Sequence, residues 1–458
     1  MKTFETAVAI IGSFAWGPVM IVFLVGTGIW LSFGTRFVQF RRLVYAFKLI
    51  FVKPDSDDGD ITPSQALMAS LAATIGTGNI AGVATAIASG GPGAVFWMWV
   101  TAAFGGASKY GEALLAIKYR TTNEDGEKSG GPMYYIKYGM TEKFGINFAW
   151  LGVAFAIFGF IAAFGIGNIV QSNSVAQAVE ASLGISPYIT GAIVAIATAL
   201  VIIGGIKSIG SVTEKIVPFM AIIYVVGSLV VIFANIDMLG SAFAMIFTNA
   251  FTGKAIGGGL LGSVIRFGVA RGLFSNEAGL GSAPIAHAAA KNNDAVKQGI
   301  LGSLGSFIDT LIICTMTALV ILVSGIVTID PVTGLMNIAG DLTGAALTTK
   351  AYTLALGGFG GFIVSFGLIF FAFSTILTWY YYGAKCAEYL FGIKATKVYR
   401  IVWPIIAFIG AVSSLDLVWN ISDAFNGLMA IPNLIALVTL SPLIFSMTKD
   451  YEKKNLKK

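Results

Sequence analysis

The sequence predicts an all-α polytopic membrane protein with about eleven transmembrane helices, and three observations support that prediction. Of the 458 residues, 56% are hydrophobic and only 11% are charged, whereas a soluble domain carries roughly 25% charged residues. Eleven apolar runs approach the length of about 20 residues that a helix needs to cross the bilayer core. The basic residues fall almost entirely on one side of the membrane that these runs define.

The apolar runs follow one another with short connections. Their approximate limits are 15–34, 66–89, 94–118, 149–179, 187–206, 213–234, 258–289, 299–326, 354–383, 399–413 and 424–447. The first run lacks the basic start and cleavage site of a signal peptide, and a basic cluster beginning at Arg36 follows it, so we interpret it as a span with a stop-transfer flank. The longest loops, 35–65 and 119–148, are too short for a separate domain. The whole chain is therefore predicted to be one integral membrane domain.

The distribution of lysine and arginine predicts the orientation. With the N-terminus outside and the C-terminus in the cytoplasm, 24 basic residues, Lys109 among them, fall in cytoplasmic stretches, and Lys2, Lys254 and Lys350 fall outside. An excess of basic residues in cytoplasmic loops is the usual arrangement. The sequence thus predicts a multi-pass protein of the cell membrane in a prokaryotic cell, with an odd number of spans.

Few residues suit metal or nucleophile chemistry. Cys314 and Cys386 are the two cysteines, and His287 is the single histidine. This set makes neither a disulfide framework nor a His-rich metal centre. The net charge of +6 comes mostly from loop residues that set the topology, so it does not indicate a nucleic-acid partner. We expect no enzyme activity, no organic cofactor and no metal other than a coupling ion.

Two runs contain glycine-rich interruptions, at Thr74–Gly82 and at Arg271–Pro284. Glycine lowers helix stability, so both stretches can unwind within the membrane. Unwound backbone is tolerated there only against protein or a wet cavity, where it can bind ions. The alternative is that the glycines only allow close helix packing. Asn79 and the Asn276–Glu277 pair lie within these interruptions, and buried polar groups favour the functional interpretation.

The positions of the interruptions predict a 5+5 inverted repeat. When the first run (15–34) is set aside as an extra N-terminal helix, ten runs remain, and each interruption falls in the first run of a group of five. Because five is odd, the groups insert with opposite orientation. The first repeat covers 66–234 and the second covers 258–447. Paired interruptions at corresponding positions are the best sequence indication of a transporter site.

The remaining polar residues within the runs have two interpretations each. The adjacent hydroxyls of Ser374 and Thr375 can ligate a hard monovalent cation, or can bond back to carbonyls of their own helix. Gln171 can face the cavity or a neighbouring helix. Four charged residues are expected to form ion pairs, with a structural role, a gating role or substrate contact left open. They are Arg266, Arg271, Glu277 and Asp309.

At three stretches the chain resembles the alanine or glycine:cation symporter family, also called the sodium:alanine symporters. These stretches are Thr74–Gly82, Asn168–Ser174 and Phe274–His287. The resemblance covers nearly the whole chain. It implies the leucine-transporter-type fold, sodium coupling, and alanine or glycine as substrate.

The resemblance also implies roles for individual residues. The amides of Thr77 and Gly78 would take the substrate carboxylate, while Phe274 and Ser275 would line the pocket. Further polar candidates for substrate binding are Asn79, Gln171 and Asn276. The sodium site would consist of the carbonyls of Ala72, Ile75 and Phe371 with the hydroxyls of Ser374 and Thr375.

The function that follows is sodium-coupled symport of alanine or glycine into the cell by alternating access. A proton-coupled amino-acid symporter is the first alternative, and a channel is the second, although channels are usually built from repeated filter loops. A membrane enzyme using Glu277 and His287 lacks a nucleophile or metal cluster. The expected partners are alanine, glycine, sodium and the lipid bilayer, with no prediction of oligomeric state.

Overall fold

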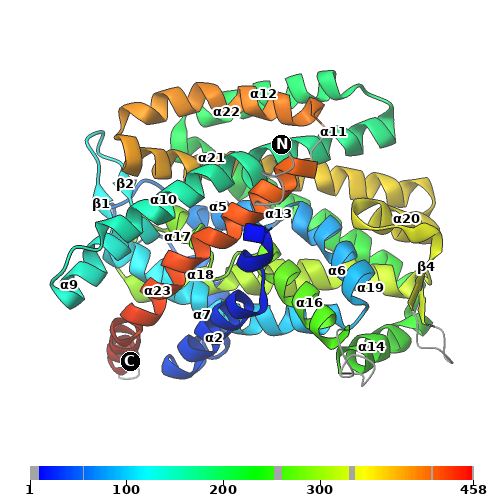
Figure 1. The fold of residues 1–458 in the computed structure, drawn as a ribbon, viewed down its shortest axis with the longest axis horizontal. Helices are drawn as coiled ribbons and strands as arrows, with labels where there is room; N and C mark the ends of the chain where they lie inside the picture. Colours follow the sequence, from blue (N-terminus) through cyan, green and yellow to red (C-terminus); the bar gives the residue numbers. More distant parts are fainter. Residues whose placement is uncertain (1–9, 55, 252–259, 330–335, 414–415, 456–458) are drawn as a thin grey trace.

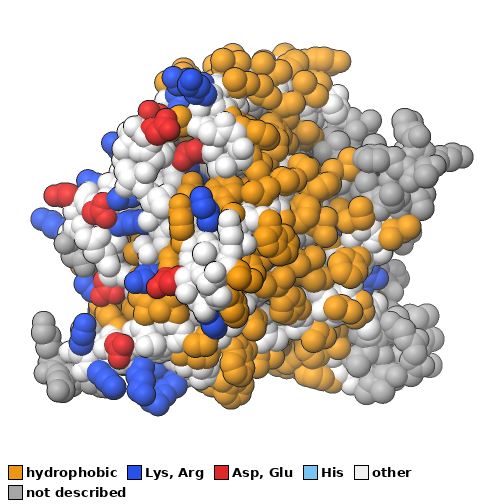
Figure 2. All heavy atoms as spheres, turned by 60° about the vertical axis from the view of Figure 1, so that its left-hand side comes forward, with side chains coloured by type: hydrophobic (Ala, Val, Ile, Leu, Met, Phe, Trp, Pro, Cys, Tyr) orange, Lys and Arg blue, Asp and Glu red, His pale blue; other side chains and the backbone are white. Residues whose placement is uncertain are grey.

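Helices make up nearly all of the regular structure in the computed structural model, which describes residues 10–54, 56–251, 260–329, 336–413 and 416–455. Within that part of the chain, seven helices are long and apolar enough to cross a membrane, and the bent pair α5–η1–α6 raises the number to eight. Hydrophobic side chains cover a wide face of the molecule, while charged side chains gather along one margin (Figure 2). The protein is therefore a multi-pass membrane protein.

The first half of the chain runs from the α2 helix to the long α13 helix. Its elements are α2 (Pro18–Gly34), α3 (Val38–Arg41), α4 (Leu43–Leu49), α5 (Pro63–Thr74), η1 (Gly78–Gly82), α6 (Val83–Gly90), α7 (Ala94–Lys118), β1 (Thr121–Thr122), β2 (Lys128–Ser129), α8 (Pro132–Tyr135), η2 (Ile136–Met140), α9 (Thr141–Phe144), α10 (Ala149–Phe164), η3 (Gly165–Ile169), α11 (Val170–Leu183), α12 (Pro187–Ile202) and α13 (Gly205–Ala234).

The second half begins with a helix that the sequence analysis did not predict, α14. Its elements are α14 (Ile236–Ala250), α16 (Leu260–Asn276), α17 (Ala283–His287), α18 (Ala295–Ser306), η4 (Phe307–Cys314), α19 (Thr315–Val323), β3 (Val327–Ile329), β4 (Met336–Ile338), η5 (Ala339–Asp341), α20 (Gly344–Leu356), α21 (Gly358–Phe391), α22 (Lys394–Val412) and α23 (Asp416–Asn455). The pairs β1–β2 and β3–β4 are short antiparallel ladders.

Eight of the eleven predicted runs coincide with the seven long helices and the bent pair. Helices occupy the other three runs as well, namely α7, α12 and α16. However, α12 has 16 residues and α16 has 17, and α7 contains Lys109 and Glu112. Length and composition alone therefore do not establish eleven spans, and both that number and the 5+5 repeat stay predictions.

The helices form two groups in contact (Figure 1). In one group, α7 packs against α16 and α18, and α18 also contacts α5. In the other group, α10 and α11 pack against α21, while α22 covers α11 and α12. The α5 helix also contacts α13 and α21, so it lies where the two groups meet. This places the first interruption at the boundary between the groups.

Close packing of α7 on α18 depends on glycines along one face of α18. A Cβ atom on Gly302 would lie 2.8 Å from the Ala113 side chain, and one on Gly305 would lie 3.0 Å from the Lys109 ammonium. Small residues allow two membrane helices to approach closely. This approach brings polar side chains of α7 to the middle of the protein.

Candidate functional site

The first interruption lies between α5 and the π-helical turn η1. The α5 helix ends at Thr74, Ile75 has extended backbone angles (φ −77°, ψ 92°), and η1 begins at Gly78. The two helical pieces are bent by 50°. The Asn79 side chain spans the gap, because its Oδ1 accepts a hydrogen bond of 2.9 Å from the Gly76 amide. The interruption that the glycine motif predicts is therefore present.

The predicted sodium ligands lie beside this interruption. Thr375 Oγ1 donates to the carbonyl oxygens of Ala72 and Phe371, at 2.9 Å each. Ser374 Oγ is 2.9 Å from the Phe371 oxygen and 3.4 Å from the Ala72 oxygen. The hydroxyls thus bond back to their own helix and also contact the broken helix. These four residues converge, with Ile75 following at the end of α5.

A small cavity of about 10 Å³ is bordered by both interruptions. Its lining residues are Ala73, Thr74, Gly76, Thr77, Gly78, Ile166, Gln171, Phe274, Glu277, Thr375 and Trp379. Gln171 Nε2 donates to Thr77 Oγ1 at 3.3 Å and to the Ile166 carbonyl at 3.0 Å. A cavity of this size has room for about one water molecule. The structure is therefore closed around the position that the sequence predicts for the substrate.

The second interruption covers fewer residues than the sequence predicted. We placed its start at Arg271, but α16 continues as a helix to Asn276. The chain then leaves the helix through residues with positive φ, which are Glu277 (54°), Gly279 (83°) and Gly281 (87°). A positive φ is uncommon for a residue other than glycine and is often found at functional sites.

Glu277 is the charged residue at the cavity. Its side chain is 3% exposed, with Oε1 accepting from Trp379 Nε1 at 3.2 Å and Oε2 accepting from Ser282 Oγ at 2.6 Å. The sequence analysis did not select Trp379. Its position four residues after Thr375, on the same helical face, is the signal that would have found it.

Asp309 connects the two interruptions. Its Oδ1 accepts from Asn79 Nδ2 at 2.7 Å, and its Oδ2 accepts from Ser275 Oγ at 2.9 Å and Thr310 Oγ1 at 2.7 Å. Asn276 Nδ2 in turn donates to Thr310 Oγ1 at 3.2 Å. The side chains of Asn79, Ser275 and Asn276 are thus directed into this network, whereas Thr77, Gly78, Gln171 and Phe274 line the cavity.

The expected ion pairs of Arg266 and Arg271 with Glu277 and Asp309 are absent from the described part of the chain. Arg266 is exposed, and the Arg271 guanidinium lies 5.6 Å from the centre of the Phe274 ring. That part of the prediction is wrong, because Arg266 is exposed at the surface and Arg271 lies against the Phe274 ring. Neutral donors satisfy both carboxylates instead.

The positive charge near these carboxylates belongs to Lys109. Lys109 was predicted to lie in a cytoplasmic stretch, but its side chain is 1% exposed within α7. It interacts electrostatically with Glu277, Asp309 and Glu112, and its ammonium has no hydrogen-bond partner among the residues that the structure describes. A lysine and a glutamate three residues apart in a predicted span were the available signal, since intramembrane charges mark functional sites.

The second interruption is braced by Asn433 of α23 and by Glu112. Asn433 Nδ2 donates to the Gly279 carbonyl at 2.9 Å and to Glu112 Oε1 at 2.6 Å. The Gly281 amide donates to the same carboxylate oxygen at 3.1 Å, and the Tyr135 hydroxyl donates to Asn433 Oδ1. Backbone groups released by the break therefore find partners on two other helices.

A second connection, the Arg120 clasp, ties residues 56–62 before α5 to residues 288–293 after α17. The Arg120 guanidinium donates to the carbonyl oxygens of Ala288 (3.0 Å), Ala290 (2.5 Å) and Asn292 (3.2 Å). It also bonds the carbonyl oxygen of Asp58 at 2.8 Å and pairs with its Oδ2 at 3.1 Å. The clasp joins the ends of α5 and α17 that lie farthest from the interruptions.

Comparison with known proteins identifies the family. The model of the sodium:alanine symporter family matches residues 1–458. The sodium/alanine symporter AgcS of Methanococcus maripaludis is 53% identical over 452 residues, which cover 98% of each chain. The chain belongs to the sodium:alanine symporter family. Its relatives are transporters, so the protein is a transporter rather than an enzyme.

Other members of the family are named for different activities. The putative sodium/proton-dependent alanine carrier protein YrbD of Bacillus subtilis is 39% identical, over 98% of this chain and 92% of its own length. The probable sodium/glutamine symporter GlnT of the same organism is 38% identical, over 98% and 91%.

Among solved structures, MhsT in complex with L-phenylalanine is similar to this chain with a TM-score of 0.54. The identity is 12%, and the match covers 84% of this chain and 97% of MhsT. At that identity the likeness concerns the fold alone, and it agrees with the leucine-transporter-type fold that the family resemblance implied.

Proposed function

We propose that the protein imports alanine or glycine together with sodium by alternating access. The observation that carries this proposal is a juxtaposition: both helix interruptions border one cavity, and the Ser374–Thr375 hydroxyls lie beside it. The sodium/alanine activity named for the M. maripaludis relative supports both the substrate and the ion.

The sodium site of this proposal consists of neutral oxygens. The carbonyls of Ala72, Ile75 and Phe371 would join the hydroxyls of Ser374 and Thr375. Hard cations prefer such oxygen ligands. Each of the two hydroxyls already lies within 2.9–3.4 Å of the Ala72 and Phe371 carbonyl oxygens, so an ion would replace hydrogen bonds rather than require a new arrangement.

In this proposal, the two charged ends of a zwitterionic substrate bind to different parts of the site. The amides of Thr77 and Gly78 at the first interruption would take the carboxylate, because helix N-termini attract anions. At the second interruption, the Glu277 carboxylate would take the ammonium. Trp379 and Ser282 hold Glu277 in position for this role.

The size of the site favours a small side chain. A Cβ atom on Gly78 would lie 3.4 Å from both the Phe274 ring and the Ser275 Cα, so the two interruptions are nearly in contact. Alanine or glycine would need a modest separation of the two helices, whereas a larger amino acid would need more. Release to the cytoplasm would require the Arg120 clasp to open, since it joins the two helices that must part.

Uptake into proteoliposomes tests the driving ion. At about 100 mV, each net charge that enters is driven by roughly 2.3 kcal/mol, so a sodium gradient with the inside negative should accumulate alanine. Equal accumulation from a proton gradient with sodium absent would contradict sodium coupling. Glycine should compete for uptake, whereas lactate and alaninamide, each lacking one charged end, should not.

Proton coupling is the second candidate, and Glu277 is the observation that favours it. A buried carboxylate at the cavity can carry a proton, and the relative YrbD is named as sodium/proton-dependent. The two candidates differ in Glu277→Gln. Under proton coupling this variant would exchange substrate without responding to a pH gradient, whereas under sodium coupling it would lose substrate binding.

We also propose the 5+5 inverted arrangement, with the N-terminus outside and the C-terminus in the cytoplasm. The packing of α7 on α18, each the second helix of its predicted repeat, supports it. Cysteines placed at Lys254 and at Lys454 should react from opposite sides of the membrane with an impermeant reagent. The native Cys314 and Cys386 are buried, so they would not obscure the result.

A further inference from the structure

The segment after α2 combines basic and apolar residues without any acid. Residues 36–53 hold five basic residues and no aspartate or glutamate. The α4 helix and its flanks expose a row of side chains at helical spacing, which we call the basic-apolar stripe. Its members are Phe40, Arg41, Val44, Lys48, Phe51, Val52 and Lys53.

The opposite face of this segment is fixed to the protein. Ala46 and Leu49 are buried, and the Phe47 ring packs edge-on against Phe307 with ring centres 6.0 Å apart. The hydroxyls of Tyr45 and Tyr451 lie 3.1 Å apart. The stripe is therefore held outward by packing on its inner side.

The apolar members of the stripe expose large fractions of their side chains, which is unfavourable if only water contacts them. Phe51 is 88% exposed, Val44 is 71% exposed and Val52 is 56% exposed. The adjoining end of α2, a candidate membrane span, exposes Trp30 (54%) and Phe33 (64%). The stripe thus continues a lipid-facing surface at the point where the chain leaves the membrane.

Two of the three basic members of the stripe lack an acidic partner among the described residues. Lys48 and Lys53 form no ion pair with any described residue, and only Arg41 is paired, with Glu452 at 2.6 Å. Apolar residues beside unpaired basic residues are typical of helices that lie in the membrane interface, where anionic headgroups attract the basic side chains.

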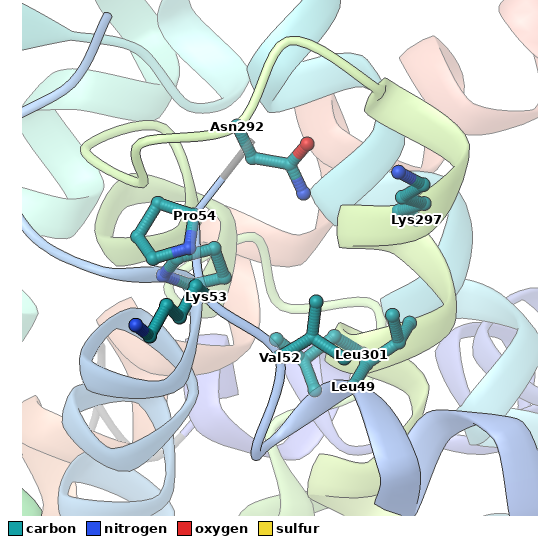
Figure 3. Close-up of a pocket in the computed structure, with 8 residues that line it drawn as sticks. Leu49, Val52, Lys53, Pro54, Asn292, Lys297 and Leu301 are labelled. Atoms are coloured by element: carbon teal, nitrogen blue, oxygen red, sulfur yellow. The ribbon is translucent and has the colours of Figure 1, made fainter. Parts of the chain in front are cut away.

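A cavity of about 30 Å³ lies behind the stripe, between the end of α4 and α18 (Figure 3). Its apolar wall includes Leu49, Val52 and Leu301, and the Asn292 amide points toward it (Figure 3). This volume holds about two water molecules, so it is too small for an acyl chain. A lipid must therefore contact the outward side of the segment rather than this cavity.

We propose that the basic-apolar stripe binds anionic phospholipid headgroups of the bilayer, with Val44, Phe51 and Val52 in the interface and Lys48 and Lys53 at the phosphates. The membrane that surrounds the protein supplies this partner. A second copy of the chain fits less well, because a two-fold contact through this face would bring two clusters of like charge together.

A fluorophore on the stripe tests the proposal in the full-length protein. Val44→Cys introduces an exposed thiol, and the native cysteines are buried, so labelling is selective. Brominated phosphatidylglycerol and brominated phosphatidylcholine, each in proteoliposomes, should both quench the probe, with phosphatidylglycerol more effective. Since each basic residue near an anionic surface contributes a factor of about five, Lys48→Gln with Lys53→Gln should lower that preference several-fold.

A matched control removes the same charge elsewhere. Lys394 and Lys397 are exposed on α22 and, among the described residues, have no ion pair, so Lys394→Gln with Lys397→Gln should leave the preference at position 44 unchanged. Quenching by iodide in water but not by brominated lipid would overturn the proposal. An equal lipid preference in both double variants would also overturn it. So would cross-linking of two copies of the chain through the thiol introduced at position 44, because a second copy would then cover the stripe.

Discussion

The two helix interruptions have a similar role in the chain but different electrostatics. The first, after Thr74, is closed by neutral groups: Asn79 accepts from Gly76, and the Thr317 and Thr348 hydroxyls bond the carbonyls of Asn79 and Ile80. The second contains a carboxylate, Glu277, within the break itself, and Glu112 of α7 bonds its backbone. Under the proposed function, the first break would take the cation and the anionic end of the substrate, and the second break would take the ammonium.

The largest effect is expected when the charged interruption is made neutral. Glu277→Gln removes the proposed partner of the ammonium, and removing one member of a buried ion pair costs about 3–5 kcal/mol. Alanine binding, measured by scintillation proximity on purified protein, should weaken by at least about 100-fold.

Ser282→Ala is the matched control, because it keeps the charge of Glu277 and removes one hydrogen bond. It should weaken alanine binding by about fivefold. Normal alanine binding by Glu277→Gln would show that the two interruptions do not differ as proposed, and that backbone carbonyls meet the ammonium.

The next effect concerns the two glycines of the neutral interruption. A Cβ atom on Gly76 would lie 2.9 Å from Thr375 Oγ1, so Gly76→Ala must displace that hydroxyl. The sodium concentration for half-maximal uptake should rise by about tenfold, as loss of roughly 1.4 kcal/mol implies.

Gly78→Ala is the contrasting substitution, because its Cβ atom would meet Phe274 and Ser275 at ordinary contact distance. It should change sodium dependence little. Gly78→Val, which adds two methyl groups at the cavity, should abolish alanine binding without preventing membrane insertion. Sodium dependence altered more by Gly78→Ala than by Gly76→Ala would place the ion elsewhere.

A smaller effect is expected from the hydroxyls alone. Thr375→Val keeps the shape of the side chain and removes an oxygen that lies 2.9 Å from two carbonyls. Uptake should need about fivefold more sodium, since one hydrogen-bonding group contributes roughly 1 kcal/mol, and adding Ser374→Ala should raise the requirement further. Unchanged sodium dependence in the double variant would mean that the hydroxyls only bond back to their own helix.

The smallest effect concerns the clasp that joins the two halves. A hydrogen bond from Lys128, with Arg120 nearby, holds the pKa of Asp58 below its ordinary value. Because the pKa of Asp58 is lowered, its carboxylate stabilises the clasp at pH values above the ordinary pKa of an aspartate. This contribution is lost as the pH falls through the lowered pKa. Protection of residues 56–62 against hydrogen exchange, taken relative to the intrinsic rate at each pH, should therefore be constant between about pH 5 and pH 8.

Asp58→Asn should speed that exchange only slightly, because the Asp58 side chain is 51% exposed and exposed ion pairs contribute little. Arg120→Gln should speed it much more, because four carbonyl acceptors lose their donor. A large effect of Asp58→Asn would show that charge, rather than backbone recognition, closes the clasp.

The sequence predicted the local features of the site better than its long-range contacts. Glycine spacing and the Ser374–Thr375 pair were sufficient to find the first interruption and its hydroxyl neighbours, because those features lie within single helices. The Asp309 network and the place of Lys109 depend on how α7, α16 and α18 pack. No periodicity within one segment encodes which side chains of another helix will face it.

The second interruption shows the same limit. Its glycines were visible, yet its start was wrong by several residues, because α16 stays helical where the sequence analysis expected it to unwind. The partners that hold the open segment, Asn433 and Glu112, come from positions about 150–170 residues away. Only the folded chain brings them together.

The Arg120 clasp has a consequence for how this region can change during evolution. The guanidinium recognises the main chain at Ala288, Ala290 and Asn292, so it places little demand on which side chains stand at those positions. Position 120 has no such freedom, because lysine presents its donors from a single point and cannot span several carbonyls. The hydrogen bonds of the closure therefore set no side-chain requirement after α17, where burial of Ala288 and Ala290 is what restricts the side chains, whereas they do require arginine at position 120.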